Sequence, residues 1–460
     1  LLSSTYVFSF FTLLSRLLGY LRDILIAIFL GASIFADAFF VAFRLPNTFR
    51  RLFAEGTFNA AFIPSYVSAK TNNQKKGKKF ADEVLSILTF VLILLILIVE
   101  IFTPYLVYLI APGFFDNDIK FSLAVEFTRI TFPFLLFVSI ASFFSGILNA
   151  NNKFAAAAAA PIILNIVLIL SLLVSYYLNL NFAEQLSYGV TLAGILQLVF
   201  LIIFTSKYYK PSIKFKLELS NKVKYFFKKL LPSVLSSGVT QINILVGTII
   251  ASFEASAVSY LYYADRIYQI NLAIAGIAVG TVSLPVLSEA FKKRNFLKIS
   301  HIQSRSIELS LLLSIPASLG LILASEEIVN ALFGYGSFTI ENIKMTSEAL
   351  KYFGYGVPAF ALIKILSNFF FARNNTKTPF YISLFIVLLN ITISIFFFDK
   401  IGFVIIPIAT SISTWIGVLL YIYILNEKNY LLLKKYLPKN IFKIIFNTII
   451  MSITLIFGLN

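Results

Sequence analysis

Eight ionisable side chains lie close together in an otherwise apolar stretch between Ser15 and Tyr66. They are Arg16, Arg22, Asp23, Asp37, Arg44, Arg50, Arg51 and Glu55. A charge inside a bilayer costs about 2.5–3.5 kcal/mol for an arginine or aspartate at mid-span. Groups placed at that cost must face one another, water or a ligand. Arginine is the side chain suited to phosphate, because its planar fork matches two oxygens at once.

Helical periodicity places several of these charges on shared faces. Arg16 and Asp23 are seven residues apart and share one stripe, whereas Arg22 points about a third of a turn away. A second stripe follows at i, i+7, i+14 and i+18, and Arg50 lies off it. The members of that second stripe are Asp37, Arg44, Arg51 and Glu55. Pro46 interrupts the second segment and is expected to bend it.

The second half of the chain adds Asp265, Arg266 and Lys364 within apolar segments. A cavity that gathers arginines from both halves would bind an anion, most naturally a diphosphate, while the acids orient the arginines and limit their repulsion. The alternative is that these charges form salt bridges between helices or snorkel to the membrane surface. The predicted substrate-binding residues are Arg16, Arg22, Asp23, Asp37, Arg50, Arg51, Glu55, Arg266 and Lys364.

The composition indicates an all-α polytopic membrane protein. Hydrophobic residues make up 59% of the chain, charged residues 13%, and the mean hydropathy is +0.88. The absence of cysteine and the single histidine argue against disulfides and metal sites. No nucleophile–base pair or nucleotide motif is visible, so we predict neither an enzyme nor a cofactor. The net charge of +17 comes largely from loop lysines, which predicts no nucleic-acid partner.

We predict about thirteen transmembrane helices from apolar length. The segments are 5–29, 34–68, 80–110, 121–149, 155–179, 185–206, 226–252, 256–290, 301–325, 343–372, 378–398, 402–425 and 438–458. Alternate connections are rich in lysine and the others are short or acidic, which places the amino terminus in the cytoplasm. The first segment is charged and longer than a signal sequence, so we expect no cleaved signal peptide.

The two halves of the chain resemble each other weakly. Pro133, Asn149 and Asn165 recur as Pro358, Asn374 and Asn390 at one constant offset. This pattern predicts two pseudo-symmetric six-helix lobes around a central cationic cavity, as in two-lobed transporters. The predicted parts are an N-terminal lobe at 1–206, a basic cytoplasmic linker at 207–225, a C-terminal lobe at 226–426, and a basic loop with a thirteenth helix at 427–460.

Five stretches of the chain closely resemble the MurJ (MviN) family of lipid II flippases, within the multidrug/oligosaccharidyl-lipid/polysaccharide exporter superfamily. They are SRLLGYLRD, ADAFFVAFRLPNTFRRLFAEGTFNAAFIP, APGF, FPFLLFVSIASFFSGILNANNKF and YYADRIYQI. The resemblance implies a monomeric, multi-pass protein of the bacterial inner membrane. It would carry lipid II, the undecaprenyl diphosphate-linked disaccharide pentapeptide from which peptidoglycan is made, to the outer leaflet by alternating access. It also implies binding roles for Arg16, Arg22, Arg50 and Arg266 toward the diphosphate, with membrane lipids around the protein.

Two departures from the family pattern matter. The family usually has fourteen helices, the last two forming a groove for the lipid tail, so this chain is either trimmed or lacks a complete groove. Some members bind sodium through carboxylates in helices seven and eleven, but 230–252 and 378–398 contain no acid. Asn390 remains there, with Gln241 and Asn243 as weaker candidates. Coupling to a monovalent cation or to the membrane potential is therefore left open.

Three other functions are compatible with parts of the pattern. A flippase for another polyprenyl-diphosphate-linked saccharide would use the same diphosphate chemistry. A cation-coupled multidrug exporter of the same superfamily would need an acidic and aromatic pocket, which the arginines argue against. A structural membrane protein would tolerate loss of its buried charges.

Overall fold

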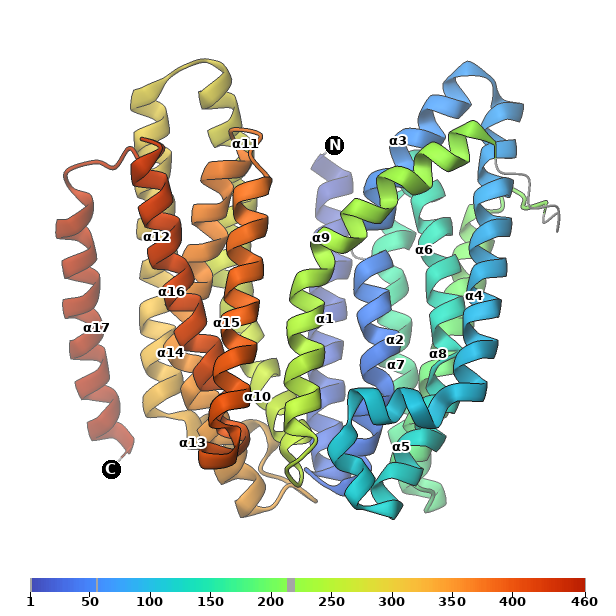
Figure 1. Ribbon diagram of the computed structural model, residues 1–460, viewed down its shortest axis with the longest axis horizontal. Helices are drawn as coiled ribbons and strands as arrows, with labels where there is room; N and C mark the ends of the chain where they lie inside the picture. The colour runs from blue at the N-terminus through green and yellow to red at the C-terminus, as the bar shows by residue number, and fades with distance from the viewer. Residues whose placement is uncertain (1, 55–56, 213–219, 460) are drawn as a thin grey trace. The chain divides into compact units, whose positions relative to one another are not determined.

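Helices form the whole architecture of the described residues in the computed structural model, which covers 2–54, 57–212 and 220–459. Each predicted membrane segment coincides with one helix or with two consecutive helices (Figure 1). The chain divides into two compact units, Leu1–Ser256 and Ala257–Asn460. We call them unit 1 and unit 2.

Unit 1 contains nine α-helices and one short 3-10 turn among its described residues. α1 packs on α7, α7 on α8, α8 on α6, and α2 on α5. The elements are α1 (Leu2–Leu30), α2 (Ile34–Ala54), α3 (Thr57–Asn72), α4 (Gln74–Ile110), η1 (Pro112–Asp116), α5 (Asp118–Thr131), α6 (Phe134–Ala150), α7 (Phe154–Leu178), α8 (Phe182–Thr205) and α9 (Asn221–Ala251).

Unit 2 is built around α14, which packs against α10, α11, α12 and α16. A π-helical stretch, η2, joins α10 to α11 without a break in the chain's direction. The elements are α10 (Ala257–Leu272), η2 (Ala273–Ala278), α11 (Val279–Lys292), α12 (Phe296–Leu323), α13 (Ser325–Phe333), α14 (Ile340–Phe371), α15 (Lys377–Ile401), η3 (Gly402–Val404), α16 (Ile405–Glu427) and α17 (Leu437–Leu459).

Nine helical stretches of the described residues are long and apolar enough to cross a membrane. Because charged or shorter segments fall outside such a criterion, the number of crossings stays a prediction. α4 begins earlier than predicted, at Gln74, so Lys75 to Lys79 form helical turns rather than a loop. The predicted single segment at 34–68 is two helices, α2 and α3.

Pro46 lies inside α2, which continues through it to Ala54. A proline cannot donate to the carbonyl four residues earlier, which here belongs to Ala42. The Thr131 hydroxyl on α5 donates to that carbonyl instead, over 3.1 Å. The helix is therefore maintained through Pro46 by a neighbouring helix that replaces the missing backbone donor.

Polar residues define many of the helix ends. Four asparagines that precede helices each accept a backbone N–H of the first turn, which satisfies a donor that has no partner within the helix. They are Asn73 before α4, Asn117 before α5, Asn181 before α8 and Asn295 before α12. Asn179 ends α7 with a left-handed backbone (φ 53°), a conformation that asparagine tolerates better than most residues.

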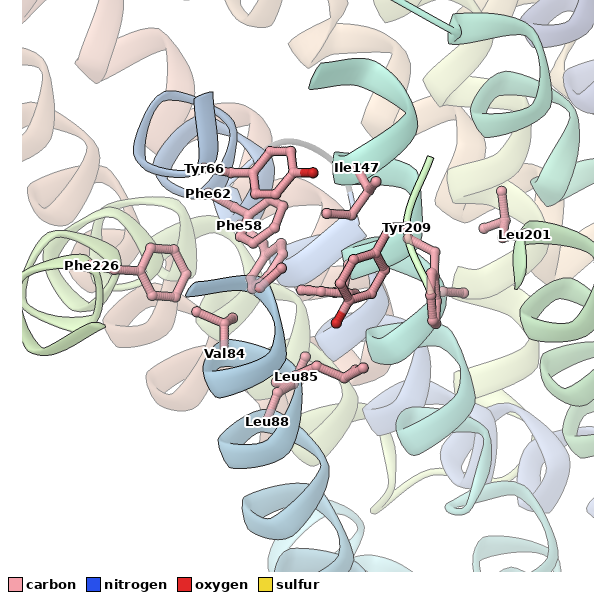
Figure 2. Packing of buried hydrophobic residues seen from close by; sticks show 14 of the residues in the cluster. Phe58, Phe62, Tyr66, Val84, Leu85, Leu88, Ile147, Leu201, Tyr209 and Phe226 are labelled. Carbon is pink, nitrogen blue, oxygen red and sulfur yellow. The ribbon is translucent and has the colours of Figure 1, made fainter. Parts of the chain in front are cut away.

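An aromatic cluster holds the beginning of α9 against α3 and α4 (Figure 2). Phe226 meets Phe58, Phe62 and Phe80 edge-on, at ring distances of 5.7, 6.2 and 6.0 Å. α9, the first helix of the predicted C-terminal lobe, belongs by its contacts to unit 1. The lobe boundaries themselves stay a prediction.

Two adjacent carboxylates at the start of α4 bind both ends of the connection between α8 and α9. Asp82 accepts from the Tyr209 hydroxyl (2.5 Å) and from the Ser212 backbone (3.0 Å). Glu83 accepts from the Ser220 hydroxyl at 2.5 Å. Burial and the neighbouring Asp82 raise the pKa of Tyr209, so its phenol stays a hydrogen-bond donor. Part of the predicted linker, 213–219, lies outside the described residues.

The connection between α16 and α17 is fixed in a similar way within unit 2. Arg373 donates to the Tyr430 carbonyl over 2.8 Å and lies 4.0 Å from the ring of Phe291. Gln303 donates to the same carbonyl and accepts from the Leu432 backbone. Burial lowers the pKa of Arg373 to about 10, so it stays charged at neutral pH. These contacts fix the connection that leads into α17.

The aromatic cluster leads to a stability prediction. Phe62 is fully buried and touches rings from three other helices, so Phe62→Ala should lower the free energy of unfolding by about 3–5 kcal/mol. Thermal unfolding of the detergent-purified chain measures the loss. Phe90→Ala is the control, because Phe90 of α4 is 44% exposed. Equal unfolding temperatures for the two variants would contradict the packing.

Candidate functional site

Arg22 of α1 is buried in a small hydrogen-bonded network. Its Nε and Nη2 both donate to Oδ1 of Asp23, over 3.0 and 2.7 Å. Its Nη1 donates to Oδ1 of Asn165 on α7 over 2.9 Å. The three residues are 5%, 2% and 6% exposed. Because the carboxylate and the amide hold all three nitrogens, the guanidinium is fixed in direction as well as neutralised.

Gly19 provides the room for this network. The Asn165 amide nitrogen lies 3.4 Å from the position that a Cβ of Gly19 would occupy, and it donates to the Ser15 carbonyl over 2.8 Å. Asn165 therefore bonds to the backbone of α1 through its nitrogen and to Arg22 through its oxygen. This double contact fixes the amide orientation and joins α7 to α1.

Asp37 of α2 forms a second buried ion pair, with Lys120 of α5. The Lys120 ammonium lies 2.6 Å from Oδ2 of Asp37 and 4.0 Å from the centre of the Phe114 ring. Asp37 is fully buried and Lys120 is 6% exposed. Asp37 thus joins two helices within unit 1. Its predicted contact with substrate stays a prediction.

The remaining predicted residues of unit 1 are less enclosed. Arg16 is exposed on α1, and Arg50 and Arg51 are half-buried on α2. The Nε of Arg50 donates to Oδ1 of Asn47 over 3.0 Å, one turn earlier on the same helix. Glu55 lies outside the described residues.

In unit 2, Arg266 of α10 is held by the ring one turn before it. Its Nη2 donates to the Tyr262 hydroxyl over 2.8 Å, and its guanidinium carbon lies 4.7 Å from the ring centre. The adjacent Asp265 accepts a hydrogen bond from Gln269. Tyr262 is buried and Arg266 is half-buried, so the Tyr262 ring and hydroxyl hold the guanidinium at the end of the Arg266 side chain.

Lys364 of α14 lies farther along unit 2, beside α11. Its Cγ is 3.2 Å from the position that a Cβ of Gly280 would occupy. Asn368, one turn later, donates to the Gly280 carbonyl over 2.7 Å. The absence of a side chain at Gly280 therefore lets the lysine stem cross α11, and the asparagine fixes the register of the two helices.

No group of three or more acidic or histidine side chains that could hold a metal ion occurs among the described residues. The polar residues of α15 and α16 bond to one another instead. Asn390 donates to Thr410 and accepts from Ser394, each over 3.2 Å. Coupling to a monovalent cation stays a prediction.

Sequence periodicity identified the charged residues but missed their partners. Asn165 was noted only as a repeat position, and Lys120, Asn47 and Tyr262 were not singled out. A signal existed for Tyr262 and Asn47, which lie four and three residues before their arginines, a spacing that brings helical side chains together. Nothing local in the sequence points from Arg22 to Asn165, which is 143 residues away.

The comparisons with known proteins decide the family. A family model described as lipid II flippase MurJ matches residues 26–460. The chain belongs to the MurJ family. It is 38% identical over 428 residues to a probable lipid II flippase MurJ of Rickettsia prowazekii, covering 92% of this chain and 83% of the relative. It is 40% identical over 412 residues to one of Rhizobium tropici, covering 88% and 77%.

Solved structures agree with this assignment. A lipid II flippase MurJ in an inward closed conformation superposes with a TM-score of 0.86 at 29% identity, covering 98% of this chain and 92% of that one. A multidrug MATE transporter of the MOP superfamily gives 0.73 at 14% identity, covering 92% and 96%, which shows a shared fold alone. The chain is thus a helical, multi-pass membrane protein of the MurJ family.

The Asp37–Lys120 pair can be tested by a double-mutant cycle. Removal of one partner leaves an uncompensated buried charge, so Asp37→Leu or Lys120→Met alone should cost about 3–5 kcal/mol of unfolding free energy. The double variant should regain most of that loss, because no charge is then left unpaired. Additive losses in thermal unfolding would mean that the two side chains do not interact.

Proposed function

We propose that this protein carries lipid II from the cytoplasmic to the periplasmic leaflet of the bacterial inner membrane, as a transporter and not as an enzyme. The observation that carries the proposal is the family match over residues 26–460, supported by relatives named as probable lipid II flippases at 38–40% identity. The arginines in the apolar helices of both units support it chemically, because a diphosphate needs fixed cationic donors.

Each arginine has a distinct part in this proposal. Arg16 is exposed and Arg50 and Arg266 are half-buried, so they can meet a diphosphate by reorienting their side chains. Arg22 is buried and already bound by Asp23 and Asn165. It supplies positive charge from a fixed position and exchanges a neutral partner, the Asn165 amide, for a phosphate oxygen. That exchange is favourable because hydrogen bonds to charged groups are the stronger ones.

Alternating access would follow from the charge balance of these groups. An empty cationic site repels itself, whereas a bound diphosphate neutralises the arginines and favours closure around the head group. The membrane potential acts on any net charge that moves, by about 2.3 kcal/mol per elementary charge per 100 mV, and could reset the empty carrier. We further propose a cytoplasmic amino terminus, a monomer surrounded by membrane lipids, and coupling to the potential or to a monovalent cation.

The proposal predicts that the arginines are essential in cells. Bacteria depleted of their own flippase should regain lipid II at the outer face, and normal walls, when they express this chain. The Arg16→Ala, Arg266→Ala double variant should fail to restore either, although it reaches the membrane at normal levels. Full rescue by the double variant would refute diphosphate binding by these arginines.

Asn165 gives a second and subtler prediction. Asn165→Ala removes the partner of the Arg22 Nη1 and the bond to Ser15, so Arg22 loses its fixed direction. Hydrogen bonds to charged groups contribute about 1.5–3 kcal/mol, and we expect transport to fall about tenfold. Ser171→Ala on the same helix is the control, because among the described residues its hydroxyl bonds only to the Val167 carbonyl of α7. Equal transport rates for the two variants would count against a role for Asn165.

A further inference from the structure

Lys364 is an isolated cation in the most enclosed part of unit 2. Between residues 356 and 371 of α14 it is the one exposed residue, and every position of this stretch is described. Its ammonium makes no hydrogen bond or ion pair with the described residues. A lysine facing hydrocarbon would cost several kcal/mol, so this side chain must face water or an anionic partner.

The packing of α14 fixes how far Lys364 lies from Arg266. The continuous stretch α10–η2–α11 runs beside α14 in the same direction. Tyr268 stacks on Phe353 at a ring distance of 5.2 Å, Gly276 lies against Ala361, and Gly280 lies against Lys364. Because Gly280 is level with Lys364, Arg266 lies fourteen residues before that level along the helical stretch. At 1.5 Å per residue this separation is about 20 Å.

A diphosphate spans only a few ångström, and the Arg266 guanidinium is held at Tyr262, one turn farther from Lys364, so one diphosphate does not contact both cations in this arrangement. We infer that Lys364 binds a second anionic group of the same substrate, namely a carboxylate at the free end of its peptide. This inference rests on the proposed function and refines the sequence prediction, which placed Lys364 with the arginines. Arg266 then contributes to the diphosphate site and Lys364 selects for the peptide.

The dimensions and the predicted topology support this division. A five-residue peptide spans up to about 17 Å when extended, and the two sugars add to that length. The basic residues Arg373 and Lys377 follow α14, so by the positive-inside rule Lys364 lies on the cytoplasmic side of Arg266. A head group entering from the cytoplasmic leaflet would reach Lys364 with its peptide while its diphosphate meets the arginines.

Gly280 and Asn368 hold the lysine for this purpose. The stem of Lys364 lies across Gly280, and the Gly280 carbonyl accepts from both Asn368 and Ser283. The backbone beside the lysine is therefore fixed, while its ammonium remains available. A compact and strongly hydrated ammonium suits a single carboxylate at the end of a flexible peptide.

The test compares substrates as well as variants, using the full chain in nanodiscs. The probes are lipid II with its pentapeptide, the same lipid with an amidated peptide carboxyl end, and the lipid-linked disaccharide without peptide. The unaltered protein should bind the pentapeptide form about tenfold more tightly than the amidated form, a comparison that needs no mutation. Lys364→Gln should abolish that difference and leave the affinity for the peptide-free form unchanged.

Three further variants complete the design. Lys364→Arg should retain the preference for the pentapeptide form over the amidated form. Lys351→Gln should leave binding of all three probes unchanged, because it removes an exposed lysine elsewhere on α14. Arg266→Gln should weaken the binding of all three probes. If Lys364→Gln weakens the binding of every probe equally, or of none, the assignment of Lys364 is overturned while the proposed function stands. If the unaltered protein binds no probe, the proposed function fails and the assignment fails with it.

Discussion

Charged side chains within long apolar helices must be neutralised or face water, and this constraint governs the structure. Unit 1 meets it by pairing: Arg22 with Asp23 and Asn165, and Asp37 with Lys120. Each pair also joins helices that are distant in sequence, α1 to α7 and α2 to α5. The charges that a transporter needs are thereby part of what holds its helices together.

Unit 2 meets the same constraint differently. Arg266 rests on the Tyr262 ring one turn away, and Lys364 lies across a glycine with its ammonium exposed. Unit 1 therefore holds its two innermost cations in ion pairs, whereas unit 2 holds Arg266 on an aromatic ring and leaves the Lys364 ammonium exposed.

The helices were predictable from sequence because long apolar runs leave little alternative in a membrane, and the family was predictable from its specific strings. The continuity of α2 through Pro46 was not predictable, because it depends on Thr131 of another helix. The packing of α9 in unit 1 depends on Phe226 meeting three rings from two other helices, α3 and α4. Such contacts between distant segments, like that of Asn165 with Arg22, leave no periodic signal along the chain.

Direct measurement of lipid II movement tests the central claim most sharply. Proteoliposomes containing the purified chain and lipid II in one leaflet would be assayed for the appearance of the head group at the opposite face. The account predicts protein-dependent translocation that is lost in Arg22→Gln and retained in Arg294→Gln, which alters an exposed arginine of a loop. Translocation that continues at the full rate without Arg22, or no translocation by the unaltered protein, would contradict it.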